Sequence, residues 1–231
     1  MQAKRGYVPK DDRYFSPKSL EILHEALGHI AYLINHGYGL KQATTFVGDH
    51  FQLAERQRIA LSRVVATDDQ LTCRRAKEVP ISQLSGKEVW IDGLNIVITL
   101  EVMLSDSTLL SCMDGAIRDL ASLRGTYRII PVTTDAIRLL FDVLEDAEVQ
   151  RVNILIDRPV SNSGRLRELL IDVGGEYQFD LDACVQDDVD RSLFGRECVI
   201  SSDSLVLDHC ASWVNLARHC MGHRGKRCLA L

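Results

Sequence analysis

The sequence predicts an α/β domain with a mainly parallel sheet, preceded by a small all-helical domain. In the first part of the chain, apolar residues recur at helical spacing. From Glu88 onward, short apolar runs alternate with amphipathic stretches, which is typical of an α/β domain. Between the two parts, residues 66–87 lose this periodicity and contain Pro80. We therefore expect a helical domain over residues 1–80 and an α/β domain over residues 87–231.

The composition is that of an ordinary globular protein. Of the 231 residues, 46% are hydrophobic and 26% are charged, and the formal net charge of -5 neither indicates nor excludes nucleic-acid binding. No apolar run is long enough to span a membrane, and the N-terminus lacks the apolar segment of a signal peptide. The 7 cysteines are scattered without a CxxC pair, which indicates reduced thiols. We therefore expect a cytoplasmic protein that does not associate with membranes.

Three helices are expected in the N-terminal domain. Ser16 is a suitable N-cap with Pro17 at the first helical position, and the apolar positions then keep a helical period as far as Ile34. A second, shorter helix is expected to end at Gly48, and a third to cover Leu53–Val65.

The third of these helices carries Arg56, Arg58 and Arg63 around its apolar side. Basic residues on a helix-loop-helix arrangement allow nucleic-acid binding, and we then expect these arginines to contact phosphates. A helical scaffold with a solvated basic face is the alternative interpretation.

The α/β domain is expected to open with a strand at Val89–Ile91 that breaks at the turn Asp92-Gly93. Later apolar runs predict further strands at Tyr127–Val132, Val152–Ile156, Glu176–Leu181 and Glu197–Ile200. The amphipathic stretches predict helices at about 94–104, 112–123, 134–146, 163–173, 186–194 and 204–221.

Aspartates follow several of these strands or open the next helix, namely Asp92, Asp135, Asp157, the group Asp187-Asp188 with Asp190, and Asp203. In a parallel sheet these side chains come to one edge, where the loops leave a crevice for ligands. Clustered carboxylates repel and raise one another's pKa unless a cation neutralises them, and hard Mg²⁺ or Mn²⁺ prefers oxygen ligands. A single aspartate after a strand is otherwise an N-cap.

The segments IDGLN, VQDDVDRSL and VISSDSLVLDH resemble the successive motifs of PIN-like domains, especially their NYN branch, over residues 87–215. The resemblance implies a three-layer α/β/α fold and a nuclease that uses Mg²⁺ or Mn²⁺. It also implies a site in which Asp92, Asp203 and either Asp187 or Asp188 hold the metal ion, and we favour Asp187. The residues that would support this site are Asn95, Asp135, Asp188 and Asp208.

The middle acid of this pattern has two candidates, Asp135 and Asp157. Asp135 has a ready structural use as the N-terminal cap of an amphipathic helix. Asp157 is followed by Arg158-Pro159, so no capping role explains it, and its strand is the more continuously apolar. We therefore favour Asp157 as the residue that completes the acidic site.

The loop DRPVSNSGR, residues 157–165, departs from the general PIN-like pattern. It places Ser161, Asn162 and Ser163 at the start of a helix, with Arg165 close by. Such an arrangement can bind the phosphate of a substrate through backbone N–H groups and the guanidinium. An ordinary turn that caps the helix is the alternative.

The whole chain also resembles an uncharacterised prokaryotic family, in which a helical N-terminal domain with a pattern like GYxxxxAxxFVGDHFxLxxRQRxAL precedes such a domain. That resemblance implies no established activity. The leading functional prediction is metal-dependent phosphodiester hydrolysis, with nucleic acid, above all RNA, as the substrate. The alternative is a catalytically inactive PIN-like module that binds nucleic acid or a protein partner. The sequence leaves the existence of a homo-oligomer open.

Overall fold

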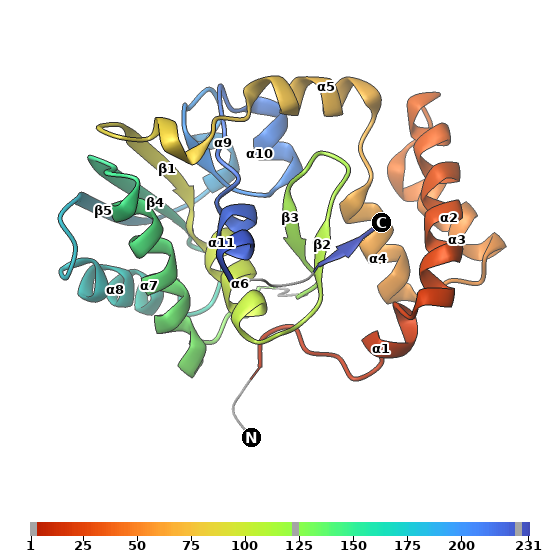
Figure 1. Ribbon diagram of the computed structural model, residues 1–231, viewed down its shortest axis with the longest axis horizontal. Helices are drawn as coiled ribbons and strands as arrows, with labels where there is room; N and C mark the ends of the chain where they lie inside the picture. The colour runs from red at the N-terminus through yellow and green to blue at the C-terminus, as the bar shows by residue number, and fades with distance from the viewer. Residues whose placement is uncertain (1–3, 122–124, 225–227) are drawn as a thin grey trace.

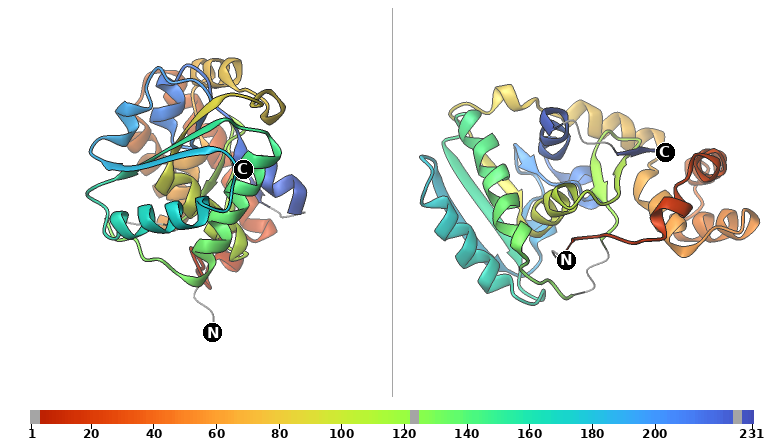
Figure 2. Two further views of the ribbon diagram at one scale, coloured as in Figure 1. Left: turned by 90° about the vertical axis from the view of Figure 1, so that its left-hand side faces the viewer. Right: turned by 60° about the horizontal axis from the view of Figure 1, so that its bottom comes forward.

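A computed structural model describes residues 4–121, 125–224 and 228–231 of the chain. A helical part formed by the N-terminal residues lies beside an α/β part, and a small second sheet stands between them (Figure 1, Figure 2). The predicted class, a helical region followed by an α/β region with a parallel sheet, is confirmed. Within the described ranges, no helix combines the length and apolar character needed to cross a membrane.

The helical part begins with a short helix that the sequence did not indicate and then follows the expected order. Helix α2 starts at Pro17, and the Ser16 side chain accepts a hydrogen bond from the Ser19 N–H at 3.4 Å, as predicted. The helices of this part are α1 Asp11–Tyr14, α2 Pro17–Asn35, α3 Leu40–His50, α4 Glu55–Val64 and α5 Asp68–Lys77, and the 3-10 helix η1 Ile81–Gln83 follows.

Helix α5 lies within the stretch 66–87, in which the sequence showed no helical periodicity. Its N-terminus carries a capping box, in which Thr67 Oγ1 accepts from Gln70 N–H at 3.2 Å and Gln70 Oε1 accepts from Thr67 N–H at 3.0 Å. The polar composition hid the helix, because only a narrow stripe with Leu71 and Arg74 is buried. The helix spans the distance between the helical part and the main sheet (Figure 1).

The main sheet has four parallel strands in the order β5-β4-β1-β6. The register pairs Ile91 with Ile154 on one side and with Ile200 on the other. Because the strands run in one direction, their carboxyl ends lie at one edge of the sheet. The strand bounds are β1 Glu88–Asp92, β4 Arg151–Asp157, β5 Asp180–Gln186 and β6 Val199–Ile200.

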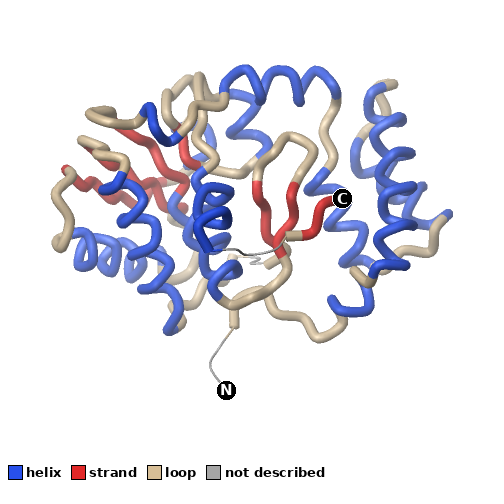
Figure 3. Tube along the Cα trace, in the orientation of Figure 1, coloured by secondary structure: helices blue, strands red, loops and turns tan. Residues whose placement is uncertain are grey.

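Helices cover both faces of this sheet (Figure 3). Since successive residues of a strand point to opposite faces, Ile91 and Ile154 enter the larger core, whereas Leu155 and Val199 enter a smaller one. The larger core lies against α6 Gly93–Leu104, α7 Pro131–Asp146, α8 Ser163–Gly174 and α11 Leu216–Arg224, and the smaller core lies against α9 Val189–Ser192 and α10 Ser204–His209. Burial on both faces explains why β4 is continuously apolar.

The predicted helix at 112–123 is wrong, because a β-hairpin occupies most of this stretch. Its strands are β2 Leu109–Ser111 and β3 Ile117–Asp119, which pair antiparallel. Between them Gly115 has φ +88°, a conformation that favours glycine. The signal was the dipeptide Asp114-Gly115, which is typical of hairpin turns. Residues 122 and 123 of the predicted helix lie outside the described residues.

The hairpin belongs to a second sheet in the order β3-β2-β7, in which β7 Leu229–Ala230 runs parallel to β2. Leu110, Cys112 and Leu120 of this region are buried in the same core as the apolar faces of α2, α3 and α4. The hairpin therefore provides the surface on which the helical part packs.

Two predicted strands are displaced. The stretch Tyr127–Val132 forms no strand, because α7 begins at Pro131, a residue favoured at the first helical position. The strand expected at Glu176–Leu181 is β5, which begins only at Asp180. The aromatic residues that suggested an earlier start pack with one another instead, since Tyr177 and Phe179 are stacked with ring centroids 5.7 Å apart.

Two predicted helices are shorter than expected. The helix at 186–194 is reduced to the four residues of α9. The helix at 204–221 is interrupted between α10 and α11, where Trp213 is fully buried. Its backbone N–H donates to Lys77 O at 3.0 Å, and its indole Nε1 donates to Arg74 O at 2.8 Å. Trp213 thereby joins this segment to the end of α5.

A buried ion pair fixes the N-terminal segment to the α/β part. Glu101 of α6 is fully buried, and its Oε2 accepts from Arg5 Nε at 2.6 Å. Its Oε1 accepts from the hydroxyls of Tyr127 and Thr133, so that segments far apart in sequence converge on one carboxylate. A buried charge of this kind is tolerated only when it is paired and hydrogen-bonded.

We expect Arg5→Met to lower the free energy of unfolding by about 3–5 kcal/mol, because it leaves the Glu101 carboxylate buried without its counter-ion. Urea unfolding followed by circular dichroism measures this change. Arg138→Met is the matched control, since Arg138 pairs with Glu176 on the surface, and it should alter stability by less than about 1 kcal/mol. Equal effects of the two substitutions would contradict the prediction.

Candidate functional site

The connections after β1 and β6 leave the sheet on opposite faces. After β1 the chain enters α6, which packs in the larger core, and after β6 it enters α10, which packs against the smaller core. Because β1 and β6 are neighbours, a crevice opens between their carboxyl ends, which is where open α/β sheets bind ligands. Asp92 ends β1 and Asp203 follows β6, so these two predicted residues flank the crevice.

Asp92 is the buried centre of this edge, with 5% of its surface exposed. Its Oδ1 accepts from the Asn95 N–H at 3.2 Å, which caps α6, and its Oδ2 accepts from the Ser201 hydroxyl at 3.1 Å. The pKa of Asp92 is raised to about 7, mainly by burial and in part by the charges of Asp190 and Asp203, although these two hydrogen bonds oppose the shift. The carboxylate is therefore held in place but is costly to ionise.

Gly93 allows the start of α6 to approach the sheet. A Cβ at this position would lie 2.8 Å from Ile154 Cγ2 and 3.0 Å from Leu155 O. The Asp92-Gly93 pair is thus more than a turn, because the missing side chain lets Asp92 cap a helix that packs directly on β4.

The Asn95 side chain, expected to support the acidic site, does so through the loop after β6 rather than through Asp92. Its Oδ1 instead accepts from the Ser202 N–H at 2.8 Å and from the Ser202 hydroxyl at 3.0 Å. The side chain therefore fixes the loop after β6. In that loop Asp203 caps α10, since its Oδ1 accepts from the Leu205 N–H at 2.8 Å.

Asp190 joins Asp92 and Asp203 at this edge. Burial raises the pKa of Asp190 to about 6, with further contributions from the charges of Asp203, Asp157 and Asp188. Burial also raises the pKa of Asp157, at the end of β4, where the Val189 N–H opposes the shift and Asp188 adds to it. We call Asp92, Asp157, Asp190 and Asp203 the acidic cluster.

Three predicted acids lie away from this cluster. Asp187, proposed as a metal ligand, pairs with Arg158 at 3.2 Å and its side chain is 72% exposed. Asp135 neither follows a strand nor caps a helix, because it is exposed in the second turn of α7. Asp208 accepts from Arg74 Nε at 2.7 Å and thus serves α5 rather than a metal ion. Asp188 is at the rim, with its side chain 62% exposed and 3.6 Å from Arg191.

The loop at 157–165 uses its polar groups within the protein. The Ser161 hydroxyl accepts from the Tyr127 N–H at 3.1 Å, and Asn162 Nδ2 donates to Tyr127 O at 2.6 Å. Ser163 is buried at the start of α8. Of the four predicted substrate-binding residues, Arg165 is the one with a charged side chain. It is exposed, and its contact with a substrate stays a prediction.

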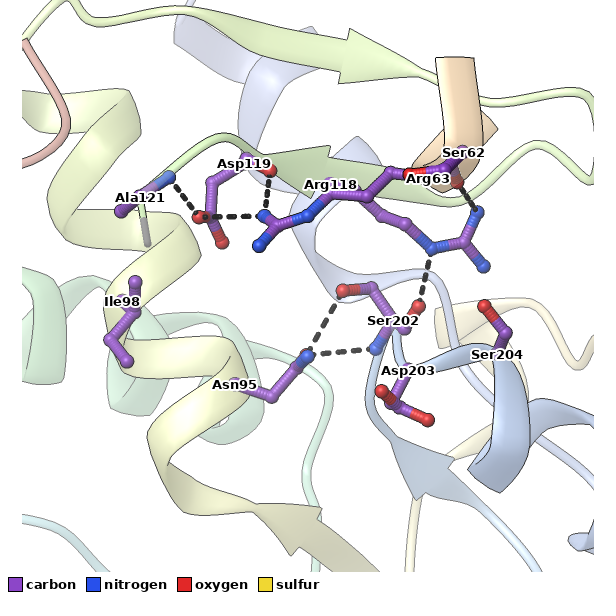
Figure 4. Close-up of a pocket in the computed structure, with 10 residues that line it drawn as sticks. All are labelled: Ser62, Arg63, Asn95, Ile98, Arg118, Asp119, Ala121, Ser202, Asp203 and Ser204. Atoms are coloured by element: carbon purple, nitrogen blue, oxygen red, sulfur yellow. Dashed lines mark hydrogen bonds and ion pairs between the residues drawn. The ribbon is translucent and has the colours of Figure 1, made fainter. Parts of the chain in front are cut away.

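A pocket of about 310 Å³ opens beside the acidic cluster (Figure 4). Asn95, Ser202 and Asp203 form the side that faces the cluster. The opposite side comes from α4 and from the hairpin, which contribute Arg63 and Asp119. The pocket is therefore built jointly by the helical part and the α/β part.

A buried arginine cluster, formed by Arg74, Asp114 and Arg118, holds the pocket wall. Arg118 Nε donates to Ser202 O at 2.6 Å, and its Nη2 donates to Asp114 Oδ2 at 2.6 Å. Arg74 of α5 donates to the same Asp114 oxygen at 2.7 Å. Although burial opposes it, the two guanidinium groups lower the pKa of Asp114. The loop that carries Asp203 is thereby tied to the hairpin and to α5.

The three arginines of α4 have different roles. Arg56 forms a two-bond pair with Asp11, at 2.5 and 2.7 Å, and also donates to Leu120 O. Arg58 donates to Leu53 O and to Asp49. Both hold the helical part together, so the expectation that they contact nucleic acid is not supported by their placement. Only Arg63 reaches the pocket.

The oxygen atoms of the acidic cluster suit a hard cation, because Mg²⁺ and Mn²⁺ take carboxylate ligands. Among the described residues, none of the ion pairs includes any of its four carboxylates. In the same ranges, no three His, Cys, Asp or Glu side chains stand close enough to hold a metal ion without moving. The donor chemistry fits a divalent cation, and binding would require the side chains to close around it.

Sequence reasoning missed two features of this edge. It chose Asp187 over Asp190, although the apolar Val189 between them indicates which side of the segment is buried. It also missed Arg118 and Asp119, because the predicted helix at 112–123 concealed the hairpin. The Asp114-Gly115 turn was the available signal for the hairpin, and therefore for Arg118 and Asp119.

Two family models and one curated relative match this chain. The model of a domain of unknown function (DUF5616) matches residues 81–219, and that of a protein of unknown function (DUF434) matches residues 22–77. An uncharacterized protein of Methanocaldococcus jannaschii is 28% identical over 185 residues, which cover 80% of this chain and 88% of that protein. No solved structure matches the chain.

The raised pKa of Asp92 predicts that stability falls as the pH rises. Because the folded state holds its proton more tightly than the unfolded state, the stabilisation is complete below about pH 4 and is lost by about pH 7. The loss attributable to Asp92 is on the order of 4 kcal/mol. Asp92→Asn should flatten this part of the pH profile, measured by urea unfolding in the presence of a chelator. A wild-type profile that Asp92→Asn leaves unchanged would refute the assignment.

Proposed function

This chain belongs to the family of DUF5616, a domain of unknown function, and we propose from its acidic edge that it is a metal-dependent phosphodiester hydrolase acting on RNA. The α/β part would then be a PIN-like domain of the NYN type. The observation that supports this proposal is the acidic cluster, in which Asp92, Asp157 and Asp203 follow three neighbouring strands and Asp190 follows the fourth.

The electrostatics of the cluster support a cation as part of the function. Asp92 and Asp190 have pKa values raised to about 7 and about 6, because both are buried near other carboxylates. A fold that keeps such groups together without a basic partner loses stability, and perturbed carboxylates of this kind cluster at functional sites. A bound Mg²⁺ or Mn²⁺ would offset the repulsion.

In this proposal Asp92, Asp190 and Asp203 hold the metal ion, with Asp157 completing the site. When bound, the ion would polarise a phosphodiester and lower the pKa of a water molecule. Asp92 and Asp203 are already fixed by hydrogen bonds from backbone N–H groups. Burial and the charges of Asp203, Asp157 and Asp188 raise the pKa of Asp190, and the charge of a bound cation would lower it again, so that the ionised carboxylate could coordinate the ion.

A second candidate is a catalytically inactive module that binds RNA or a protein partner. It is favoured by the absence, within the described ranges, of three side chains spaced to hold a metal ion. For either function we expect a cytoplasmic location, which rests on the scattered cysteines of the sequence.

We expect the wild type to cleave a labelled single-stranded RNA in Mn²⁺ or Mg²⁺, and Asp92→Asn or Asp190→Asn to reduce the rate by roughly 100-fold or more. Calorimetry should show that both variants also lose Mn²⁺ affinity. Asp135→Asn is the matched control, because it removes the same charge from an exposed position on α7, and it should behave as the wild type.

Two results would separate the candidates. RNA binding by the wild type without cleavage in any divalent cation would support the inactive module. Cleavage that survives in Asp92→Asn would instead place the active site elsewhere. Asp157→Asn, compared with Asp135→Asn, tests which middle acid serves the ion.

A further inference from the structure

We propose that the pocket beside the acidic cluster holds one nucleotide unit of the substrate and that Arg63 binds its phosphate. This inference rests on the proposed function, which it deepens by giving the helical part a role in substrate binding. Arg63 comes from α4, whereas the acidic cluster comes from the main sheet. A complete site would therefore need both parts of the chain.

Arg63 is the pocket arginine whose guanidinium keeps unused hydrogen-bond donors. Its Nη1 donates to Asp119 O and lies 3.5 Å from Asp119 Oδ1, and its side chain is 34% exposed. Among the described residues, its Nε and Nη2 atoms donate to no protein acceptor. Arg118, in contrast, uses Nε, Nη1 and Nη2 on Ser202, Arg63 and Asp114. The guanidinium presents its N–H donors as a planar fork, which matches the spacing of phosphate oxygens. An arginine with free donors at a pocket wall is therefore suited to bind a phosphate.

Asp119 can release Arg63 to a substrate. Its Oδ1 also accepts from the Ala121 N–H at 2.7 Å, and its Oδ2 accepts from the Thr99 hydroxyl at 3.1 Å. These two donors keep the Asp119 carboxylate satisfied when the Arg63 side chain turns to a phosphate. The exchange gives up a long, partly exposed ion pair, and both Asp119 oxygens remain hydrogen-bonded.

The shape of the pocket restricts what can enter. Its volume of about 310 Å³ lies at the lower end of ligand pockets, which suits a single nucleotide better than a base pair. Ile98 and Ala121 provide apolar wall for a sugar or a base, and Ser62 lies next to Arg63 on α4. We therefore infer a single-stranded substrate that places one unit here.

The pocket adjoins the acidic cluster, so a nucleotide bound in it would lie next to the proposed site of hydrolysis. Asp203 lines the pocket and also raises the pKa of Asp92 and Asp190 by its charge. A phosphodiester at the acidic cluster and a second phosphate at Arg63 would thus lie on either side of Asp203. Arg63 would act as a substrate-positioning residue, without a part in the chemistry.

The test uses Ser62→Glu and Ser62→Gln, which differ only in charge. If a phosphate lies beside Ser62 and Arg63, Ser62→Glu should weaken the binding of adenosine 5′-monophosphate by about tenfold relative to Ser62→Gln, measured by calorimetry on the full chain. Arg63→Ala should weaken it by a similar factor, while Arg138→Ala, remote from the pocket on α7, should not. Melting temperatures confirm that each variant is folded.

Binding of the monophosphate that is the same in Ser62→Glu and Ser62→Gln, or no binding by the wild type, would overturn the inference. Neither result bears on hydrolysis, which Asp92→Asn tests separately. If the wild type cleaves RNA, Arg63→Ala should raise KM about tenfold with little change in kcat. The reason is that it removes an interaction that the bound substrate and the transition state share equally. A loss confined to kcat would also overturn the positioning role.

Discussion

The buried arginine cluster determines how the rest of the molecule is arranged. Arg74 and Arg118 share the carboxylate of Asp114, and each comes from a different part of the chain. Because Arg118 also donates to Ser202 O, the same cluster sets the position of the loop that follows β6. Helix α5, the hairpin and the acidic edge are thereby held in one relative position, and the pocket between them depends on it.

The acidic edge itself works against stability. Gly93 removes the side chain that would keep α6 away from β4, and this close approach leaves Asp92 buried beside other carboxylates. A structure selected for stability alone would place apolar or paired groups there. The fold instead keeps the repulsion and stabilises the region with the nearby ion pairs of Arg74 and Arg118. A destabilising site surrounded by stabilising contacts is typical of a functional site.

The sequence predicted the parts of the fold that depend on local signals. The cap at Ser16, the strand that ends at Asp92 and the helix after Asn162 are all read from neighbouring residues. Asp92 and Asp203 were identified because parallel strands must end at one edge. The edge strand β5 was misplaced, since alternating polar residues give it little apolar signal.

The remaining part of the site could not be predicted, because it depends on contacts between distant residues. Arg63 meets Asp119 across 56 positions, and Arg118 meets Ser202 across 84. No periodicity or motif links such residues, and the three arginines of α4 look equivalent in sequence. Only their partners distinguish Arg63, which faces the pocket, from the two that hold the helical part together.

The place of β6 in the chain also has a consequence for synthesis on the ribosome. Strand β1 pairs with β4 on one side and with β6 on the other, but β6 is formed only by Val199–Ile200. Until these residues emerge, the nascent chain presents one unpaired edge of β1, and Asp92 lacks the hydroxyl of Ser201. Unpaired strand edges are prone to association, so the interval before residue 200 is the period in which the nascent chain depends most on protection from aggregation.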